Sequence, residues 1–341
     1  MIKSTKIAVD AMGGDFGPES TVIASCRYVQ NNPDVSIALY GDSTTIKKYI
    51  SDSIKNISVH HCDKSIKMSD GLLATLKRYM QSSLGKSVEA QITQNADVTV
   101  SAANTGSLMA VSKRILNTIP GIERPAIVSS FPTKTDKNTW LLDLGANIEC
   151  DMLNMMQFAM MGTYVAICQG ISQPRVAILN IGHEPHKGNR LIKQSDALFK
   201  KLPINYIGYI EPTQIYNDFA DVVVCDGFSG NILLKSCEGT SRFLKYVYNE
   251  TFKSSILGRL TAYLMKTQLK TRLRYIDPKF RNGAVLMGLN GIVVKSHGSA
   301  CAEAFYNAIE LAHRSLSMPQ KISFQDYYQS NFKELNAVLQ D

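Results

Sequence analysis

The sequence contains little of what stabilises small secreted proteins or zinc-dependent folds. Its seven cysteines are scattered, and no two stand closer than twelve positions apart. That spacing argues against a disulfide framework or a zinc cluster and suits a reducing cytosol. No secretory signal is recognisable before the first apolar run at residues 7–9, so we expect the protein to be cytoplasmic.

The motifs that mark several large enzyme classes are also missing. The chain has no Walker sequence, and its glycines at 13, 14 and 17 do not form a G-x-G-x-x-G fingerprint. Residues 227–231 resemble the nucleophile elbow of serine hydrolases, but asparagine replaces its final glycine. The histidines at 60–61 and at 183 and 186 lack the spacing or the helix of a zinc site. We therefore expect neither a metal nor an organic cofactor.

The composition is that of an ordinary globular enzyme. The 341 residues are 45% hydrophobic and 19% charged, with a formal net charge of +8. Large α/β folds reach this length as one domain, so we expect a single domain over residues 1–341. The longest uncharged stretch, residues 152–174, contains polar residues and two glycines. It predicts a buried methionine-rich helix that ends near Gly170, and not a membrane span.

One arrangement recurs along the chain: a short apolar run, a polar turn containing glycine or asparagine, and then a helical pattern. Near-continuous apolar runs followed by helices are typical of parallel strands joined by right-handed crossovers. This pattern predicts a doubly wound, mostly parallel, Rossmann-like α/β sheet. We expect the carboxyl ends of these strands to meet at one edge, where such folds bind ligands. The runs are residues 7–9, 98–100, 140–142, 176–179, 222–225 and 292–294.

Two of the polar turns have the composition of anion-binding helix starts. Residues 104–107 and 226–231 each place glycine and small polar residues directly before an apolar helical run. The free N–H groups of a helix start attract anions, although each turn could equally be a simple N-cap. Lys187 stands beside Gly188 in another of these turns, so it is either a ligand for a bound anion or a solvated surface charge.

One segment departs from the alternating pattern. Residues 253–281 contain eight basic residues and one acid, so this stretch carries nearly all of the net charge. Apolar residues recur at helical spacing in its first half, which predicts a basic amphipathic helical excursion over residues 245–285. We find no aromatic stacking pattern or module typical of nucleic-acid binding. The expected docking residues are Arg259, Lys266, Lys270, Arg272 and Arg274.

Eight stretches, in order along the chain, resemble one bacterial family. Together they are similar to the phosphate acyltransferases, the acyl-ACP:phosphate transacylases of the PlsX family. Each stretch is weak evidence alone, but the series extends from residue 7 to about residue 315. The stretches are VDAMGGD at 9–15, SAANTG at 101–106, GIERP at 121–125, LDLGAN at 142–147, LNIG at 179–182, NYIGY at 205–209, CDGFSGN at 225–231 and KSHG at 295–298.

The resemblance implies an activity, an assembly and two catalytic residues. The activity is transfer of a long acyl chain from acyl carrier protein to inorganic phosphate, giving acyl phosphate for phospholipid synthesis. The resemblance also implies a homodimer and a fold related to phosphotransacetylases and isocitrate-dehydrogenase-like enzymes. The family's catalytic lysine matches Lys187 in HKGN, and its catalytic asparagine matches Asn231 in CDGFSGN. Ala103, where the family usually has glycine, and His183 and Pro185, in a loop that is usually acidic, depart from the pattern.

The chemistry of this reaction is compatible with the residues. Phosphate is itself the nucleophile, so the enzyme needs an anion cradle, alignment and a donor for the oxyanion. We expect Lys187 to supply positive charge to phosphate and Asn231 to donate to the thioester carbonyl. The expected phosphate- and substrate-binding residues are Gly13, Gly14, Asp15, Asn104, Thr105, Gly106, Asn147, Asp226, Gly227, Ser229, Gly230 and His297.

The basic segment has three candidate partners. Acyl carrier protein is acidic and the inner membrane leaflet is anionic, so either could dock on it. A membrane acyltransferase could also receive the product there, or the helix could pack in the dimer. The rival functions are a phosphotransacetylase-like enzyme using acyl-CoA, a decarboxylating dehydrogenase on a similar fold, and a non-catalytic anion- or membrane-binding protein.

Overall fold

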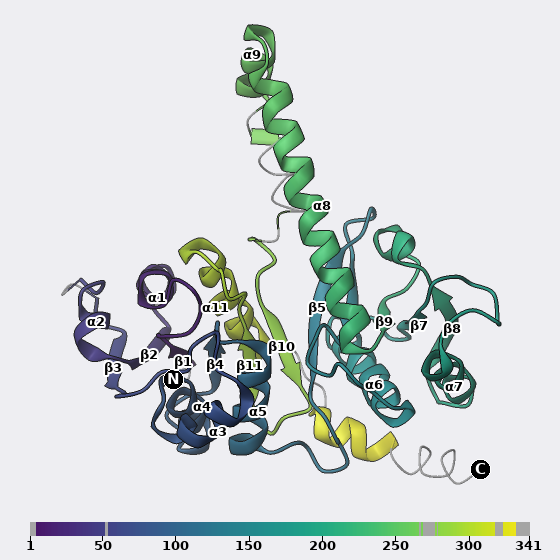
Figure 1. Ribbon diagram of the computed structural model, residues 1–341, viewed down its shortest axis with the longest axis horizontal. Helices are drawn as coiled ribbons and strands as arrows, with labels where there is room; N and C mark the ends of the chain where they lie inside the picture. Colours follow the sequence, from purple (N-terminus) through teal and green to yellow (C-terminus); the bar gives the residue numbers. More distant parts are fainter. Residues whose placement is uncertain are drawn as a thin grey trace.

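The structure is a computed structural model that describes residues 5–51, 54–265, 267–268, 277, 279–317 and 323–331. Within them, one mixed sheet has the strand order β3-β2-β1-β4-β11-β10-β5-β6-β9-β7-β8. Figure 1 shows two α/β halves on either side of the central strands. The strands are β1 (Thr5–Asp10), β2 (Val35–Gly41), β3 (Ile57–His61), β4 (Val98–Ser101), β5 (Ala126–Pro132), β6 (Asn138–Leu142), β7 (Arg175–Leu179), β8 (Asn205–Ile210), β9 (Val222–Val224), β10 (Ala284–Met287) and β11 (Ile292–Lys295).

Helices cover both faces of the sheet, so the molecule has three layers. In the first half, Ile7 and Val9 of β1 pack toward α1 and α11, whereas the alternate residue Ala8 packs toward α4. The helices are α1 (Pro18–Asn31), α2 (Ser43–Lys47), α3 (Leu72–Arg78), α4 (Ser83–Ile92), α5 (Thr105–Leu116), α6 (Met152–Cys168), α7 (Arg190–Phe199), α8 (Gly227–Lys253), α9 (Ile256–Leu264) and α11 (Ala302–Ser317), with short 3₁₀ turns at Tyr79–Gln81 and Pro212–Asn217.

The six apolar runs of the sequence are strands β1, β4, β6, β7, β9 and β11, as predicted. The expectation that all their carboxyl ends meet at one edge is wrong. β10 pairs antiparallel with both β11 and β5, and β5 pairs antiparallel with β6. This threefold reversal turns β6, β9, β7 and β8 against the direction of β1, β4 and β11. The predicted turns therefore fall into two groups, one for each half of the sheet.

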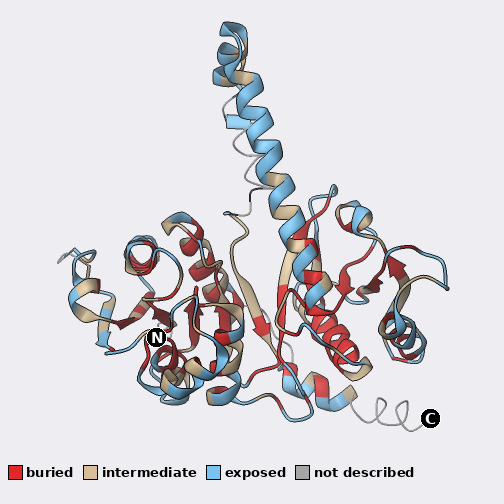
Figure 2. Ribbon diagram, viewed as in Figure 1, coloured by how far each residue is buried: buried red, intermediate tan, exposed pale blue. Residues whose placement is uncertain are grey.

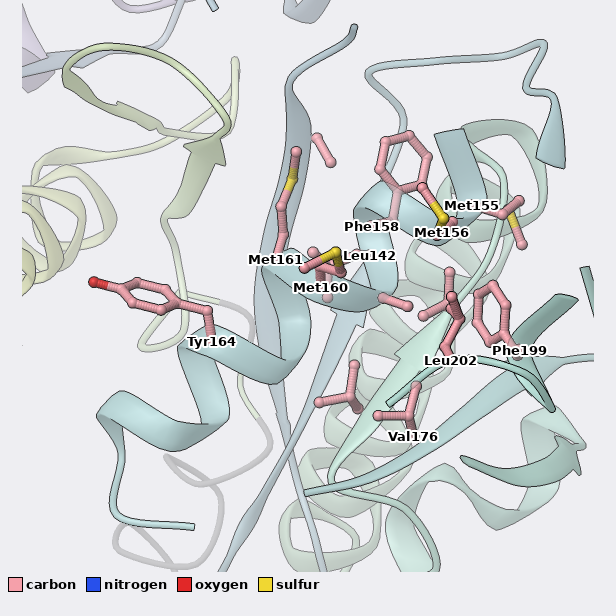
Figure 3. Packing of buried hydrophobic residues seen from close by; sticks show 14 of the residues in the cluster. Leu142, Met155, Met156, Phe158, Met160, Met161, Tyr164, Val176, Phe199 and Leu202 are labelled. Carbon is pink, nitrogen blue, oxygen red and sulfur yellow. The ribbon is translucent and has the colours of Figure 1, made fainter. Parts of the chain in front are cut away.

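The methionine-rich stretch is the buried helix that the sequence predicts. α6 begins after Asp151, whose side chain accepts from the backbone N–H of Asn154 in a reciprocal capping box, and it ends at Cys168. Figure 3 shows its methionines and Phe158 packed against Leu142, Val176 and Phe199. Gly162 lets this helix approach the sheet, since a Cβ there would lie 2.4 Å from a methyl group of Val222. No helix of the described residues is long and apolar enough to cross a membrane.

α8 leaves the body of the protein. Its 27 residues correspond to about 40 Å at 1.5 Å per residue. The first turns pack on the second half of the sheet, and the rest projects outward with α9 beside its far end (Figure 1). Figure 2 shows this projecting part as almost entirely exposed. The projecting part lies in the excursion expected over residues 245–285. Of the expected docking residues, Arg259 is described, whereas Lys266, Lys270, Arg272 and Arg274 lie outside the described residues.

Candidate active site

In the first half, the loops that follow β1 and β11 touch each other. The backbone N–H of Asp15 donates to the carbonyl of Gly298 at 2.8 Å. Gly14 has a φ of +86°, and a Cβ on it would lie 2.8 Å from that same carbonyl oxygen. A Cβ on Gly13 would lie 2.7 Å from a carboxylate oxygen of Asp10. Close packing on the Gly298 carbonyl therefore explains Gly14, and packing on the Asp10 carboxylate explains Gly13. Gly14 and Asp15 lie against Gly298, the residue after His297.

A buried carboxyl group lies beneath these loops. Asp10 is 1% exposed, and its Oδ2 accepts from Ser101 Oγ at 2.7 Å. Ser101 Oγ in turn accepts from the backbone N–H of Ala103 at 3.0 Å. Burial raises the pKa of Asp10, and its Oδ1 has no hydrogen-bond partner among the described residues. Asp10 thus joins the β1 loop to the β4 loop.

The β4 loop is an N-cap. Asn104 Oδ1 accepts from the backbone N–H of Ser107 at 2.8 Å, and Asn104 Nδ2 donates to the carbonyl of Met68 at 3.1 Å. Thr105 is the first residue of α5, and the nearest atom to a Cβ on Gly106 is Asn104 Oδ1 at 3.7 Å. Ala103, which departs from the family pattern, is not among the residues with positive φ, so alanine fits this turn without strain.

In the second half, the turn after β6 is built around Asp143. Its carboxylate accepts from the N–H groups of Ile127 at 2.8 Å, Ala146 at 3.2 Å and Asn147 at 2.6 Å, and from Asn147 Nδ2 at 2.9 Å. Burial raises the pKa of Asp143 to about 6, against the opposing effect of these donors. Asn147 is 2% exposed, and its Nδ2 also donates to the carbonyl of Pro125. Asn147 therefore holds the turn.

The start of α8 packs directly on this turn. Asp226 caps the helix by accepting from the backbone N–H and the hydroxyl of Ser229, both at 2.8 Å. A Cβ on Gly227 would lie 2.4 Å from the carbonyl oxygen of Asn147, and one on Gly230 would lie 1.9 Å from that of Asp143. Both glycines are thus needed to seat the helix.

Asn231 follows at once and is exposed at the mouth of this turn. Gly145 has a φ of +110°, and a Cβ on it would approach the side chain of Asn231 to between 3.3 and 3.5 Å. The side-chain amide of Asn231 therefore lies over the β6 turn, where a substrate can reach it.

Lys187 lies in the loop that follows β7. β7 and β9 are neighbouring parallel strands, so Lys187 and Asn231 both follow strand ends at the same edge. A Cβ on Gly182 would lie 3.2 Å from Cγ of Lys187, and the Lys187 N–H donates to the carbonyl of Glu184 at 3.0 Å. His183, which departs from the family pattern, lies 3.9 Å from Glu211 across the loop.

α8 connects the two groups of predicted residues. Asn231 and Lys235 are four positions apart and so share one face of the helix. Lys235 Nζ lies 2.8 Å from His297 Nε2, which belongs to the first half, and 3.1 Å from Glu238 Oε2. The Lys235–His297 contact therefore joins the start of α8, which packs on the second half, to the β11 loop of the first half.

Comparison with known proteins identifies the family. Residues 5–320 match the family model described as "Fatty acid synthesis protein". The chain is 42% identical over 330 residues to the phosphate acyltransferase of Vibrio parahaemolyticus, covering 94% of this chain and 96% of that one. It is 44% identical over 324 residues to that of Photobacterium profundum, covering 93% and 95%. The chain belongs to the phosphate acyltransferase family. It is therefore an acyltransferase, as the resemblance implies.

Solved structures share the fold at low sequence identity. A phosphotransacetylase from Streptococcus pyogenes matches with a TM-score of 0.60 and 16% identity, covering 93% of this chain and 95% of that one. A branched-chain phosphotransacylase from Enterococcus faecalis matches with a TM-score of 0.58 and 14% identity, covering 92% and 99%. A 4-hydroxythreonine-4-phosphate dehydrogenase from Klebsiella pneumoniae matches with a TM-score of 0.53 and 13% identity, covering 91% and 99%. The predicted relation to phosphotransacetylase folds is confirmed.

Two side chains beside His297 carry no signal in the sequence. Lys235 and Glu238 approach His297 Nε2 to 2.8 and 3.8 Å, although Lys235 and His297 are 62 positions apart. Lys295 lies two residues before His297, in the KSHG stretch. The described residues contain no group of three His, Cys, Asp or Glu side chains able to hold a metal ion.

A groove of about 1580 Å³ lies elsewhere, over the central strands. Its lining includes Trp140, Tyr164, Met287 and Phe324 but neither of the predicted catalytic residues. The groove is thus separate from the start of α8, where Asn231 lies.

Proposed function

We propose that this acyltransferase moves a long-chain acyl group from acyl carrier protein to inorganic phosphate and releases acyl phosphate for phospholipid synthesis. The observation that carries the proposal is the placement of Lys187 and Asn231. These residues match the family's catalytic pair, and they follow neighbouring parallel strands at one edge. In this scheme the phosphate oxygen attacks the thioester carbonyl, and the thiolate of the carrier leaves and takes up a proton.

Each of the two residues has a distinct part in the proposed reaction. Asn231 is exposed on the second turn of α8, so its neutral amide can donate to the oxyanion without losing a buried partner. One such donor is worth about 3–4 kcal/mol of transition-state stabilisation. Lys187 is only partly exposed and supplies a positive charge that attracts phosphate and neutralises charge as the new bond forms.

The competing functions differ in the acyl donor and in whether any transfer occurs. The assay mixes protein and phosphate with palmitoyl-ACP, palmitoyl-CoA or acetyl-CoA and traps acyl phosphate with hydroxylamine. The proposal expects hydroxamate with palmitoyl-ACP at the highest kcat/KM. Activity with acetyl-CoA alone would favour a phosphotransacetylase. No hydroxamate with any donor would favour a non-catalytic anion- or membrane-binding protein.

The tip of the projecting segment has the character of a lipid-binding helix. Ile256, Leu257, Tyr263 and Leu264 of α9 are 83%, 73%, 74% and 72% exposed. Together with Leu260 they form one apolar stripe, because their spacing follows the helical repeat. An apolar stripe in a basic segment suits an anionic membrane surface better than it suits an acidic protein. We propose that α9 associates peripherally with the cytoplasmic face of the membrane.

Vesicle binding tests this placement. The variant Leu257→Ser/Leu264→Ser should lose co-sedimentation with phosphatidylglycerol vesicles while keeping its KM for soluble acyl-ACP. The control is Leu73→Ser, since Leu73 is 78% exposed but lies on α3 in the body of the protein. An unchanged vesicle affinity and a raised KM for acyl-ACP would instead assign α9 to the carrier protein.

The part of α8 around residues 243–247, here called the stem, supports the proposed homodimer. Phe243, Leu244, Tyr246 and Val247 are 63%, 48%, 62% and 41% exposed on this projecting helix. Exposed apolar clusters of this kind mark protein contacts, and tertiary packing usually provides most of a helix's stability. We propose that a second copy of the chain covers the stem. Light scattering should give twice the chain mass for the wild type and a lower mass for Phe243→Ser/Tyr246→Ser.

A further inference from the structure

A cluster of cations lies one turn beyond Asn231, where α8 meets the first half of the protein. Lys235 Nζ is 2.8 Å from His297 Nε2, and Glu238 Oε2 lies 3.8 Å from that same ring nitrogen. Arg242 lies 3.6 Å from Glu238 on the next turn. The side chains of Lys235 and His297 are 47% and 39% exposed, so a solute can reach them.

Lys295 adds a second lysine to this cluster. It ends β11, is only partly exposed, and donates to the backbone carbonyl of Ser296. It forms no ion pair with any described residue. Burial, and then the positive charge of Lys235, lowers the pKa of Lys295 to about 8, while Asp15 opposes this effect. Two neighbouring lysines, one of them desolvated and unpaired, are the arrangement that a bound anion would stabilise.

The ring of His297 lies between Ser299 and Lys235. Its Nδ1 lies 2.9 Å from Ser299 Oγ, and its Nε2 faces the Lys235 ammonium. The backbone N–H of Ser299 also donates to Nδ1 at 3.2 Å. Burial and the nearby lysines lower the pKa of His297, which favours its neutral form. The positive charge of the cluster therefore resides on Lys235, Lys295 and Arg242, against Glu238 and Asp15.

The loop after β1 lies beside this cluster. The loop of Gly14 and Asp15 packs against Gly298, directly after His297. We propose that Lys235, Lys295 and His297 form a binding subsite for a phosphate group, one helical turn from Asn231. This inference rests on the proposed acyl transfer, in which two phosphate groups occur: inorganic phosphate and the phosphodiester of the carrier's pantetheine arm.

The test compares Lys235→Gln and Lys295→Gln with the matched control Lys245→Gln. Lys245 lies farther along the same helix and pairs with Asp277 at 2.9 Å. Activity is measured with palmitoyl-ACP and with palmitoyl-pantetheine, which lacks the phosphodiester. Binding of inorganic phosphate alone is measured by calorimetry. The variant Lys295→Arg keeps the charge and should retain most of the affinity, which separates loss of charge from loss of folding.

The outcomes are distinct. If the subsite takes inorganic phosphate, both Gln variants should raise its Kd and its KM about 10- to 100-fold with either donor, as expected for a lost charged hydrogen bond. If it takes the phosphodiester, only the KM for palmitoyl-ACP should rise. If both variants stay within twofold of the Lys245→Gln control on every constant, the subsite is refuted. If the wild type itself transfers no acyl group, the proposed function fails, and the phosphate calorimetry still decides whether the cations bind phosphate.

Discussion

The start of α8 packs so closely on the β6 turn that a single added methyl group should displace it. In Gly230→Ala the new Cβ would stand 1.9 Å from the carbonyl oxygen of Asp143 and 2.8 Å from Cys225 Sγ. Both neighbours are buried, and one is backbone, so the helix start has to move away by about 1 Å. A displacement of that size near the reacting atoms can lower turnover about 100-fold. Overpacking of this kind also destabilises a fold by about 1–3 kcal/mol.

The matched control is Gly239→Ala on the same helix. A Cβ there meets no atom within 4 Å, so alanine should raise stability by about 0.5–1 kcal/mol and leave the turnover unchanged. The assay measures kcat and KM for palmitoyl-ACP, after thermal unfolding has shown that each variant is folded. Since Gly230 precedes Asn231, the loss should appear mainly in kcat. If folded Gly230→Ala kept kcat within twofold of Gly239→Ala, the position of Asn231 would not depend on the contact between Gly230 and Asp143, and the reasoning would be refuted.

Three further predictions concern single side chains. Lys187→Ala and Asn231→Ala should each lower kcat by about two to three orders of magnitude with an unchanged melting temperature, because each removes one preorganised group outside the core; normal turnover at saturating phosphate would contradict this. At pH 7, Asp143→Asn should cost about 2–4 kcal/mol in urea unfolding, because its new amide faces backbone donors, whereas Asp10→Asn should cost under about 1 kcal/mol, because its partner is the Ser101 hydroxyl, which can turn to suit either amide atom; equal losses would refute that contrast. Burial and the charge of Lys235 lower the pKa of Lys295 to about 8, so the KM of the subsite's ligand, phosphate or palmitoyl-ACP, should rise between pH 7 and 9 as the charge is lost, and Lys295→Arg should remove that rise; an unchanged slope in the arginine variant would exclude Lys295 as its source.

Most helices and strands could be predicted from the sequence, because a buried parallel strand appears as a short, continuous apolar run. Each of the six apolar runs became a strand, and the uncharged stretch at residues 152–174 became the buried helix α6. The caps were also readable, since Asn104 and Asp226 each stand directly before a helical pattern and accept from its third residue. Local patterns of this kind need no knowledge of the tertiary structure.

The direction of the strands was not readable in the same way. An apolar run has the same pattern whichever direction its strand takes in the sheet. The strands of the second half are reversed because β10 and β5 pair antiparallel with their neighbours. The site was misread as one edge for the same reason. The contact between Lys235 and His297 joins residues that are far apart in sequence, and only the course of α8 brings them together. The close approach of Gly230 to the carbonyl of Asp143 is likewise a tertiary contact that the sequence does not mark.

The most direct test of the account is to identify the product formed from palmitoyl-ACP and phosphate. Phosphorus NMR and mass spectrometry should show palmitoyl phosphate and free carrier thiol in equal amounts with the wild-type protein. Product formation should fall by about two to three orders of magnitude in Asn231→Ala. Palmitate in place of palmitoyl phosphate, with hydroxylamine absent and the product shown to be stable under the assay conditions, would mean hydrolysis and would contradict the proposed transfer to phosphate.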